Sequence, residues 1–344
     1  MAGPCLIWLL DAPPTRLCFL SGFIRGEEQL NWLLGVIAVL LLLDLILRVV
    51  YVRLVLRIFE AKPPFSAPTL PPHPSAETIE FPTGNGLVLR GSLYCHPERS
   101  SRGLILFCPE MDCSHWSAMS YCSGLIDNGF DVMSFDFRGQ GESDPQPNYV
   151  PNHWPTMFEV EDVRAALDFI QTRNDLRELP LGVMGISRGS APALIGAAEC
   201  PGVGAVCCEG AYSTDSLMLY FMMRWATLYV PGWALSLVPK WHYRITSKMV
   251  RWTSSFLRRR RYVVLEKWLP KLKGRPVLLV AGERDNYVHS DVTRELQRRI
   301  KSSSAKIWHV PRAKHNQARA TAGAEYDRRL TDFFSQLQSP TTAT

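Results

Sequence analysis

A serine flanked by two glycines lies in the middle of the chain, where apolar residues give way to small ones. Gly185, Ser187 and Gly189 form the pattern G-x-S-x-G between an apolar run, 180–186, and a small-residue stretch, 189–199. The glycines allow a sharp backbone turn, which lifts the serine hydroxyl above the end of a strand. Glycine and serine are common, so the pattern gains meaning only if a base and an acid accompany it.

Two such residues follow later in the chain. Asp285 closes the turn at the end of residues 275–285, which begin as an apolar run. His315 follows the last apolar run, 305–311. A serine hydroxyl becomes a nucleophile when a histidine takes its proton, and a carboxylate holds that histidine in the correct tautomer. We therefore predict Ser187 as nucleophile, His315 as general base and Asp285 as the orienting acid.

Other polar residues lie near the predicted strand ends and could also contribute to the site. Glu209 is an alternative acid, although a surface or loop-directed glutamate is the simpler interpretation. His115 and His289 either line the pocket or are ordinary polar loop residues, and we prefer the second. We expect Asp136 to be structural, accepting backbone amides near the serine turn, and Cys108 to be a buried thiol.

The elements that must position these residues alternate in type. Residues 77–95 read as two strands joined by a Gly-Asn-Gly turn. Further strands are predicted at 103–108, 131–137, 180–186, 203–210, 275–285 and 305–311, and helices at 117–130, 156–173, 189–199, 290–300 and 325–337. This order predicts an α/β protein with a mostly parallel sheet covered by helices on both faces, so the three residues meet at the carboxyl ends of the strands.

Residues from about 77 to 337 resemble an α/β-hydrolase fold enzyme. The resemblance rests on the order Ser187, Asp285, His315 and on residues 136–143, which are similar to the D-x-R-G-x-G-x-S loop of that family. It implies acyl transfer through a covalent acyl-enzyme, with the backbone N–H of Arg188 as one oxyanion donor. The family usually has His-Gly after its third strand, but Pro109 and Glu110 stand here, which leaves the N–H of Met111 as the second donor.

An insertion at about 213–272 is where such hydrolases carry a cap over the active site. Its first part is rich in Met, Trp, Tyr and Leu, and residues 240–275 are strongly basic, with Glu266 as their single acid. Either the aromatic side chains pack on the hydrolase while the cations face water, or the cap rests on an anionic membrane with Arg258–Arg261 at the phosphates. We favour the second slightly.

The N-terminal part reads as a membrane anchor. Residues 31–52 are apolar over a bilayer-spanning length, with Asp44 and Arg48 spaced to pair; a buried helix of the domain is the alternative. We therefore divide the chain into an N-terminal segment (1–30), an anchor with its basic flank (31–58), a Pro-rich spacer (59–76), the hydrolase with its cap (77–337) and a flexible tail (338–344). The spacer either extends as polyproline II or lies along the domain. The basic flank predicts a single-pass protein with its catalytic domain on the cytoplasmic side.

Composition bounds the remaining choices. The chain has 344 residues, 47% hydrophobic and 20% charged, which excludes a disordered or fibrous protein. Its nine cysteines contain no C-x-x-C pair, and free thiols favour a reducing compartment. We expect no metal, no organic cofactor and no nucleic-acid partner. The prediction is a serine esterase acting on a small-molecule or lipid acyl substrate, cleaving an ester or thioester. An acyltransferase or a peptidase with the same triad, and a catalytically silent binding protein, remain alternatives.

Overall fold

A computed structural model describes residues 15–61, 70–95, 101–300 and 302–338 of the chain. The chain divides into two compact units, residues 1–55 and 56–344. Residues 62–69 of the predicted spacer and 339–344 of the predicted tail lie outside the described residues. Residues 70–76 of the spacer are described, and there the ring of His73 lies 5.7 Å from that of Tyr94.

The first unit is built on a single long helix, α1 (Thr15–Glu60), whose last turn belongs to the second unit. Within the described residues, the 32-residue part Gln29–Glu60 is long and apolar enough to cross a membrane. At 1.5 Å per residue it exceeds the roughly 30 Å of bilayer hydrocarbon. The predicted pair is formed, with Arg48 Nε 2.6 Å from Asp44 Oδ2.

The second unit contains an eight-stranded sheet in the order β1-β2-β4-β3-β5-β6-β7-β8. β1 and β2 form an antiparallel hairpin, β2 also pairs antiparallel with β4, and the remaining pairs are parallel. The strands are β1 (Glu77–Pro82), β2 (Val88–Tyr94), β3 (Leu104–Cys108), β4 (Asp131–Phe135), β5 (Leu181–Ile186), β6 (Val203–Glu209), β7 (Val277–Gly282) and β8 (Ala305–Val310). Every strand and helix predicted for this unit is present, with ends that differ by a few residues.

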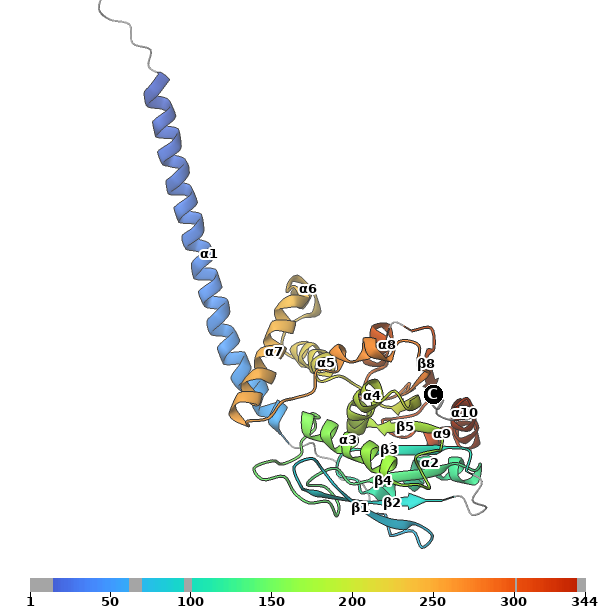
Figure 1. Cartoon of the computed structure of the whole chain (residues 1–344). Helices are drawn as coiled ribbons and strands as arrows, with labels where there is room; N and C mark the ends of the chain where they lie inside the picture. Colours follow the sequence, from blue (N-terminus) through green and yellow to red (C-terminus); the bar gives the residue numbers. More distant parts are fainter. Residues whose placement is uncertain (1–14, 62–69, 96–100, 301, 339–344) are drawn as a thin grey trace, which may run out of the picture. The chain divides into compact units, whose positions relative to one another are not determined.

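Helices cover both faces of the sheet (Figure 1). One apolar core lies between the sheet and α3 (Met157–Thr172), α4 (Ser190–Glu199) and α8 (Ser290–Ile300). A second core lies between the other face and α2 (Ala118–Asp127), α9 (Ala318–Ala322) and α10 (Ala324–Phe334). β3, β4, β5 and β7 are buried along their whole length, as continuous apolar runs predict for central parallel strands.

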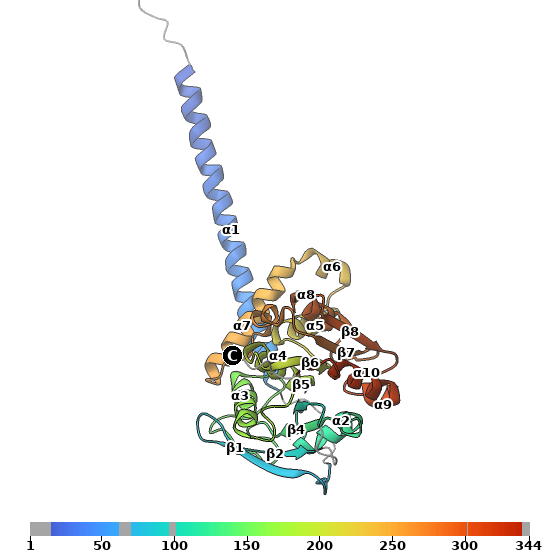
Figure 2. The same cartoon turned by 45° about the vertical axis from the view of Figure 1, so that its right-hand side comes forward.

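The segment between β6 and β7 is helical. It contains α5 (Thr214–Ala226), α6 (Gly232–Leu237), α7 (Lys240–Leu257) and two short 3₁₀ turns, Leu265–Lys267 and Leu269–Leu272. α5 packs against α7 and α8. In both Figure 1 and Figure 2, α6 projects further from the sheet than α5 does. We call this segment, residues 213–272, the cap.

Candidate active site

Ser187 lies on a tight turn between β5 and α4. Its backbone φ is +49°, a left-handed conformation that costs a non-glycine residue of the order of 1–3 kcal/mol. Gly189 permits this turn, because a Cβ there would lie 2.4 Å from the carbonyl oxygens of Cys108 and Pro109. A Cβ on Gly185 would lie 2.7 Å from Cα of Ser190. Both glycines of the motif are therefore required by close backbone approach, and the serine is held at the carboxyl end of the sheet.

The three residues predicted for acyl transfer form one hydrogen-bonded row. Ser187 Oγ lies 2.8 Å from His315 Nε2, and His315 Nδ1 lies 2.7 Å from Asp285 Oδ2. The other carboxylate oxygen of Asp285 accepts the N–H groups of Tyr287 and Val288, both at 2.8 Å. Asp285 is buried and His315 is partly exposed, so the carboxylate is fixed while the imidazole can reach a substrate. Such a row can move a proton from the hydroxyl to the imidazole.

The loop after β3 carries the unusual Pro109-Glu110-Met111 sequence. Its start lies directly over the serine turn, as the close approach of Gly189 to the Pro109 carbonyl requires. Glu110 Oε1 accepts a hydrogen bond from the Tyr121 hydroxyl at 2.8 Å. Burial raises the pKa of Glu110, which favours the neutral carboxyl and weakens repulsion of a nearby oxyanion. The N–H groups of Arg188 and Met111 stay predicted oxyanion donors.

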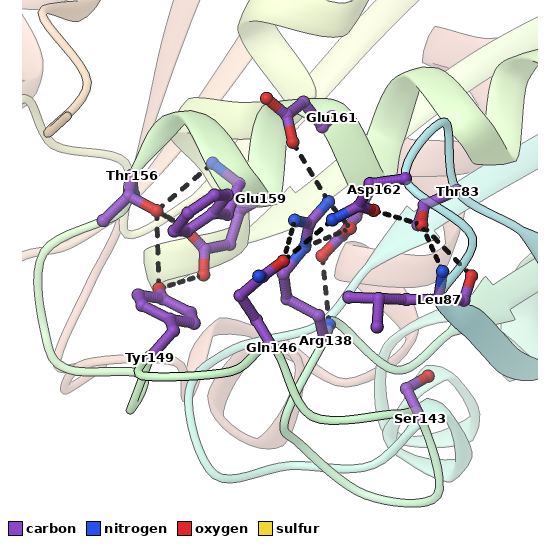
Figure 3. Close-up of polar contacts among 12 residues, drawn as sticks. Thr83, Leu87, Arg138, Ser143, Gln146, Tyr149, Thr156, Glu159, Glu161 and Asp162 are labelled. Atoms are coloured by element: carbon purple, nitrogen blue, oxygen red, sulfur yellow. Dashed lines mark hydrogen bonds and ion pairs between the residues drawn. The ribbon is translucent and has the colours of Figure 1, made fainter. Parts of the chain in front are cut away.

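The D-x-R-G-x-G-x-S loop holds the neighbouring loops in place. Asp136 accepts the N–H groups of His115 at 2.5 Å and of Glu142 at 2.7 Å. Gln140 Oε1 accepts the N–H of Asp112 at 2.9 Å, just past the Pro-Glu-Met sequence. Asp136 is thus structural, as predicted, although its amide partners lie in the loops after β3 and β4. Arg138 of this loop binds Asp162 of α3, with Nε 2.7 Å from Oδ1 (Figure 3).

The remaining candidates lie outside the hydrogen-bonded row. His115 is buried against Asp136, and His289 is half-exposed beside Asp291. Cys108 is buried in β3, and burial raises the pKa of its thiol well above the usual value. The interpretation of Glu209 as a surface residue is wrong. It is buried, and its carboxylate accepts the N–H of Ala318 and the hydroxyl of Tyr326, both at 2.9 Å, because the sheet edge faces the helices that follow His315.

A buried ion pair beneath the serine turn was missed by the sequence reasoning. The side chain of Arg188 donates to Glu159 Oε1 at 2.8 Å and to the carbonyl of Asn152 at 2.6 Å, and both charged groups are almost fully buried. Glu159 also accepts the N–H of Thr156 at 2.7 Å and the Tyr149 hydroxyl (Figure 3). Thr156 and Glu159 form the capping box that begins α3. The T-x-x-E spacing of residues 156–159 was a signal for the cap, but no local pattern identified Arg188 as its partner.

An aromatic side chain also contacts the imidazole of His315. The Tyr287 ring lies 5.0 Å from that of His315, and its hydroxyl lies 2.6 Å from His153 Nδ1. Burial lowers the pKa of His153 to about 3, so this imidazole is neutral at physiological pH. From Tyr287 the aromatic contacts continue to Phe221 at 5.7 Å and on to Trp225 at 5.5 Å, both on α5 of the cap. These ring contacts connect His315 to Phe221 and Trp225, which we call the aromatic wall of the cap.

The described residues contain no group of three His, Cys, Asp or Glu side chains placed to hold a metal ion. The chemistry available at this site, on the side chains present, is proton transfer and nucleophilic attack.

Comparisons with known proteins agree with this architecture. A hydrolase family model, described as serine aminopeptidase S33, matches residues 99–264. An uncharacterized Escherichia coli protein, YcjY, is 27% identical over 118 residues, which are 33% of this chain and 38% of that protein. The chain thus aligns with well under half of that relative's length.

Solved structures share the fold. A Pyrococcus furiosus esterase superposes with a TM-score of 0.58 at 18% identity, covering 79% of this chain and 97% of the esterase. A dienelactone hydrolase from Anabaena variabilis gives 0.51 at 17% identity, covering 76% and 95%. A cold-adapted esterase from an Arctic intertidal metagenomic library gives 0.54 at 16% identity, covering 78% and 97%. At these identities the likeness establishes the fold.

Proposed function

We propose that this chain is a serine hydrolase of the α/β-hydrolase superfamily and that it cleaves a carboxylic ester or thioester with an apolar acyl group. The observation that carries the proposal is the row from Ser187 Oγ through His315 to Asp285, with contacts of 2.8 and 2.7 Å. The family model and the esterase structures support an ester-acting hydrolase.

The reaction follows from this geometry. Ser187 Oγ attacks the carbonyl carbon while its proton passes to His315 Nε2, and Asp285 stabilises the resulting imidazolium. The tetrahedral intermediate collapses as His315 returns the proton to the leaving alkoxide or thiolate. A water then gives a proton to His315 and attacks the acyl-enzyme. His315 returns this proton to Ser187 Oγ as the C–O bond to the serine breaks, which releases the carboxylic acid and restores the hydroxyl. The N–H groups of Arg188 and Met111 would stabilise the oxyanion in both halves.

The preference for an apolar acyl group rests on the aromatic contacts around His315. Tyr287, Phe221 and Trp225 extend from the imidazole onto α5. Their rings offer apolar surface but few hydrogen-bond partners, so they favour a hydrocarbon chain over a polar one.

Two alternatives use the same catalytic residues, and a third is a silent binding protein. The serine aminopeptidase name of the family favours testing an amide, and acyl transfer to an alcohol would need only a different acceptor in the second half. The Pro109-Glu110 sequence favours a silent binding protein, because it replaces the usual His-Gly. Against this, the Tyr121 hydroxyl donates to Glu110, and burial raises the pKa of Glu110. The raised pKa favours the neutral carboxyl, which repels a developing oxyanion less than a carboxylate does.

The described apolar helix supports a membrane location for this hydrolase. Leu40, Leu41 and Leu42 of α1 are each more than half exposed, as lipid-facing side chains would be. The last turn of α1 belongs to the hydrolase unit, where Phe59 is buried and stacks on Trp154 at 4.9 Å. This packing supports a retained single-pass anchor over a removed leader.

Covalent labelling of the full chain by a fluorophosphonate probe tests the proposal. We expect the parent protein and Ser120→Ala, a variant of an exposed serine, to label equally. Ser187→Ala should not label, and His315→Ala should label at least about 10³-fold more slowly than the parent. A panel of short and long esters, thioesters and an aminoacyl amide then separates the substrate classes. A folded parent protein that does not label would reject the proposal in favour of the silent binding protein.

A further inference from the structure

The cap helix α7 has its apolar side chains on the outside. Residues 241, 245, 252 and 256 are separated by one, three and four helical turns, so they share one stripe. All four side chains are exposed: Trp241 57%, Ile245 43%, Trp252 60% and Phe256 84%. A surface helix of a soluble domain packs its apolar stripe on the core. Because this stripe is exposed instead, we expect it to contact an apolar surface outside the domain.

The opposite side of α7 explains why the helix lies this way. Its buried residues are mainly polar: Thr246, Ser247, Val250, Arg251 and Ser254. Arg251 Nε pairs with Asp215 Oδ1 of α5 at 2.7 Å. Ser254 Oγ donates to Glu60 Oε1 at 2.8 Å and also contacts the Tyr262 hydroxyl at 2.9 Å. Rotating α7 to bury the aromatic stripe would expose or break these contacts, so the orientation is fixed.

Two observations identify the surface that covers the stripe. First, Glu60, which ends the apolar helix α1, is bound by Ser254 of α7 and by Arg258 Nη2, at 2.6 Å, directly after that helix. α7 is therefore tied to the point where the proposed anchor ends. Second, residues 240–261 contain eight Lys or Arg and no Asp or Glu. Lys240, Arg244 and Lys248 are exposed along α7, beside or within the stripe.

We propose that α7 lies on an anionic lipid bilayer, with the stripe of Trp241, Ile245, Trp252 and Phe256 inserted among the lipids and the neighbouring cations at the phosphates. Helices of this kind rest in the interface with the apolar side about 5–10 Å deep. Trp233 and Leu237 of α6, also exposed and spaced by one turn, extend the contact. The inference rests on the membrane location proposed above but is independent of hydrolysis. It would set the aromatic wall of α5 beside the lipid from which an acyl substrate enters.

Depth-dependent quenching of a fluorophore tests this contact in the full chain. In a background with Cys5, Cys18, Cys95 and the partly buried Cys200 changed to serine, Phe256→Cys carries a polarity-sensitive label, and Glu178→Cys provides an exposed control on the hydrolase. The protein is reconstituted in nanodiscs of phosphatidylcholine, with or without phosphatidylserine, and doxyl-labelled lipids serve as quenchers. We expect the label at 256, but not at 178, to shift to the blue and to be quenched, most strongly with phosphatidylserine.

A second variant separates lipid from other partners of the stripe. Lys248→Glu, on the exposed stripe, should lower quenching at position 256 at least severalfold in phosphatidylserine discs and leave the label at 178 unchanged. A label at 256 that remains in water in both lipid compositions overturns the proposal. A blue shift without lipid quenching overturns it in favour of a second copy of the chain. Fluorophosphonate labelling of Ser187 in the same discs reports the hydrolase site separately, so either idea can fail alone.

Discussion

At the scale of single residues, Asp285 is held in place by three hydrogen bonds. One carboxylate oxygen holds His315 Nδ1 at 2.7 Å and the other accepts two backbone N–H groups. In Asp285→Asn the amide oxygen can keep the backbone contacts, while the amide nitrogen donates to Nδ1. The imidazole then carries its proton on Nε2 and cannot accept the Ser187 proton. We expect kcat on a soluble ester to fall about 10⁴-fold with little change in Tm.

The control for this prediction is Asp291→Asn, which changes an exposed aspartate that contacts His289. It should leave kcat within about twofold, since this exposed carboxylate lies outside the hydrogen-bonded row of Ser187, His315 and Asp285. If Asp285→Asn keeps its activity, a different acid orients His315, and the row described above does not act as proposed.

Glu209 gives a prediction about pH. Burial raises its pKa from 4.5 to about 7, so the native state binds a proton more tightly than the unfolded chain does. The free energy of unfolding should therefore decrease as pH rises from about 5 to about 7, and the loss is complete above the native pKa. Glu209→Gln keeps an acceptor for the Ala318 N–H and has no charge to bury.

The measurement is Tm of the parent and of Glu209→Gln at several pH values, followed by intrinsic fluorescence. We expect parent and variant to have similar Tm near pH 5. At higher pH the variant should have the higher Tm, and the difference in free energy of unfolding should grow to a few kcal/mol by pH 8. Exposed Glu178→Gln should follow the parent at every pH. A constant difference between parent and Glu209→Gln across this range would contradict the assignment.

At the scale of elements, the serine turn and α3 are joined by the buried pair Arg188–Glu159. In Glu159→Gln the guanidinium stays buried without its counter-charge, which typically costs about 3–5 kcal/mol. We expect a large fall in Tm together with slower probe labelling of Ser187, because the Arg188 side chain no longer holds the turn. Thermal unfolding and labelling rates measured on the same samples check both effects.

Glu161→Gln is the matched control, because Glu161 lies on the same helix with a side chain 47% exposed. It should cost less than about 1 kcal/mol. The double variant Arg188→Met/Glu159→Met should recover much of the lost stability, since it buries no charge. Equal losses of unfolding free energy in Glu159→Gln and Glu161→Gln would show that burial of the Arg188–Glu159 pair does not increase the cost of breaking it.

Elements were predictable wherever a local pattern decided the structure. Apolar runs such as 103–108 and 180–186 became buried strands, and the G-x-S-x-G spacing predicted a strand, a tight turn and a helix around Ser187. The partner of Arg188 lies 29 residues away, and no local pattern encodes such a pairing. The orientation of α7 was also hidden, because the same amphipathic sequence fits a helix facing either way. It is decided by distant partners, Asp215 and Glu60.

At the scale of the whole molecule, the chain order of the candidate site was predictable but its support was not. Ser187, Asp285 and His315 follow three different strands, and a mostly parallel sheet brings such strand ends together. Glu209 shows the limit of this reasoning. Its position after β6 is apparent from the sequence, but its burial depends on α9 and α10 packing over the sheet edge.

The side of the membrane that holds the hydrolase is a further prediction at this scale. Four cations, Arg48, Arg53, Arg57 and Lys62, lie near the C-terminal end of the apolar stretch, against Arg16 and Arg25 on the other side. Basic residues near the ends of a span favour the cytoplasm, so we expect the hydrolase there. With a C-terminal epitope tag, protease added to intact cells should leave the domain whole, and permeabilised cells should lose it.

The variant Arg53→Ser/Arg57→Ser tests the cause of that orientation. Both side chains are exposed, so the substitutions should leave the fold of the hydrolase intact, which its thermal unfolding verifies. Removing two of the cations that favour the cytoplasmic side should leave a measurable fraction of the chains inverted and digestible from outside, because the remaining charge bias is smaller. Replacing Lys306, an exposed cation far along the chain in β8, by serine should leave the orientation unchanged. Digestion of the parent domain in intact cells would place the hydrolase outside, and the cations of α7 would then face the outer leaflet.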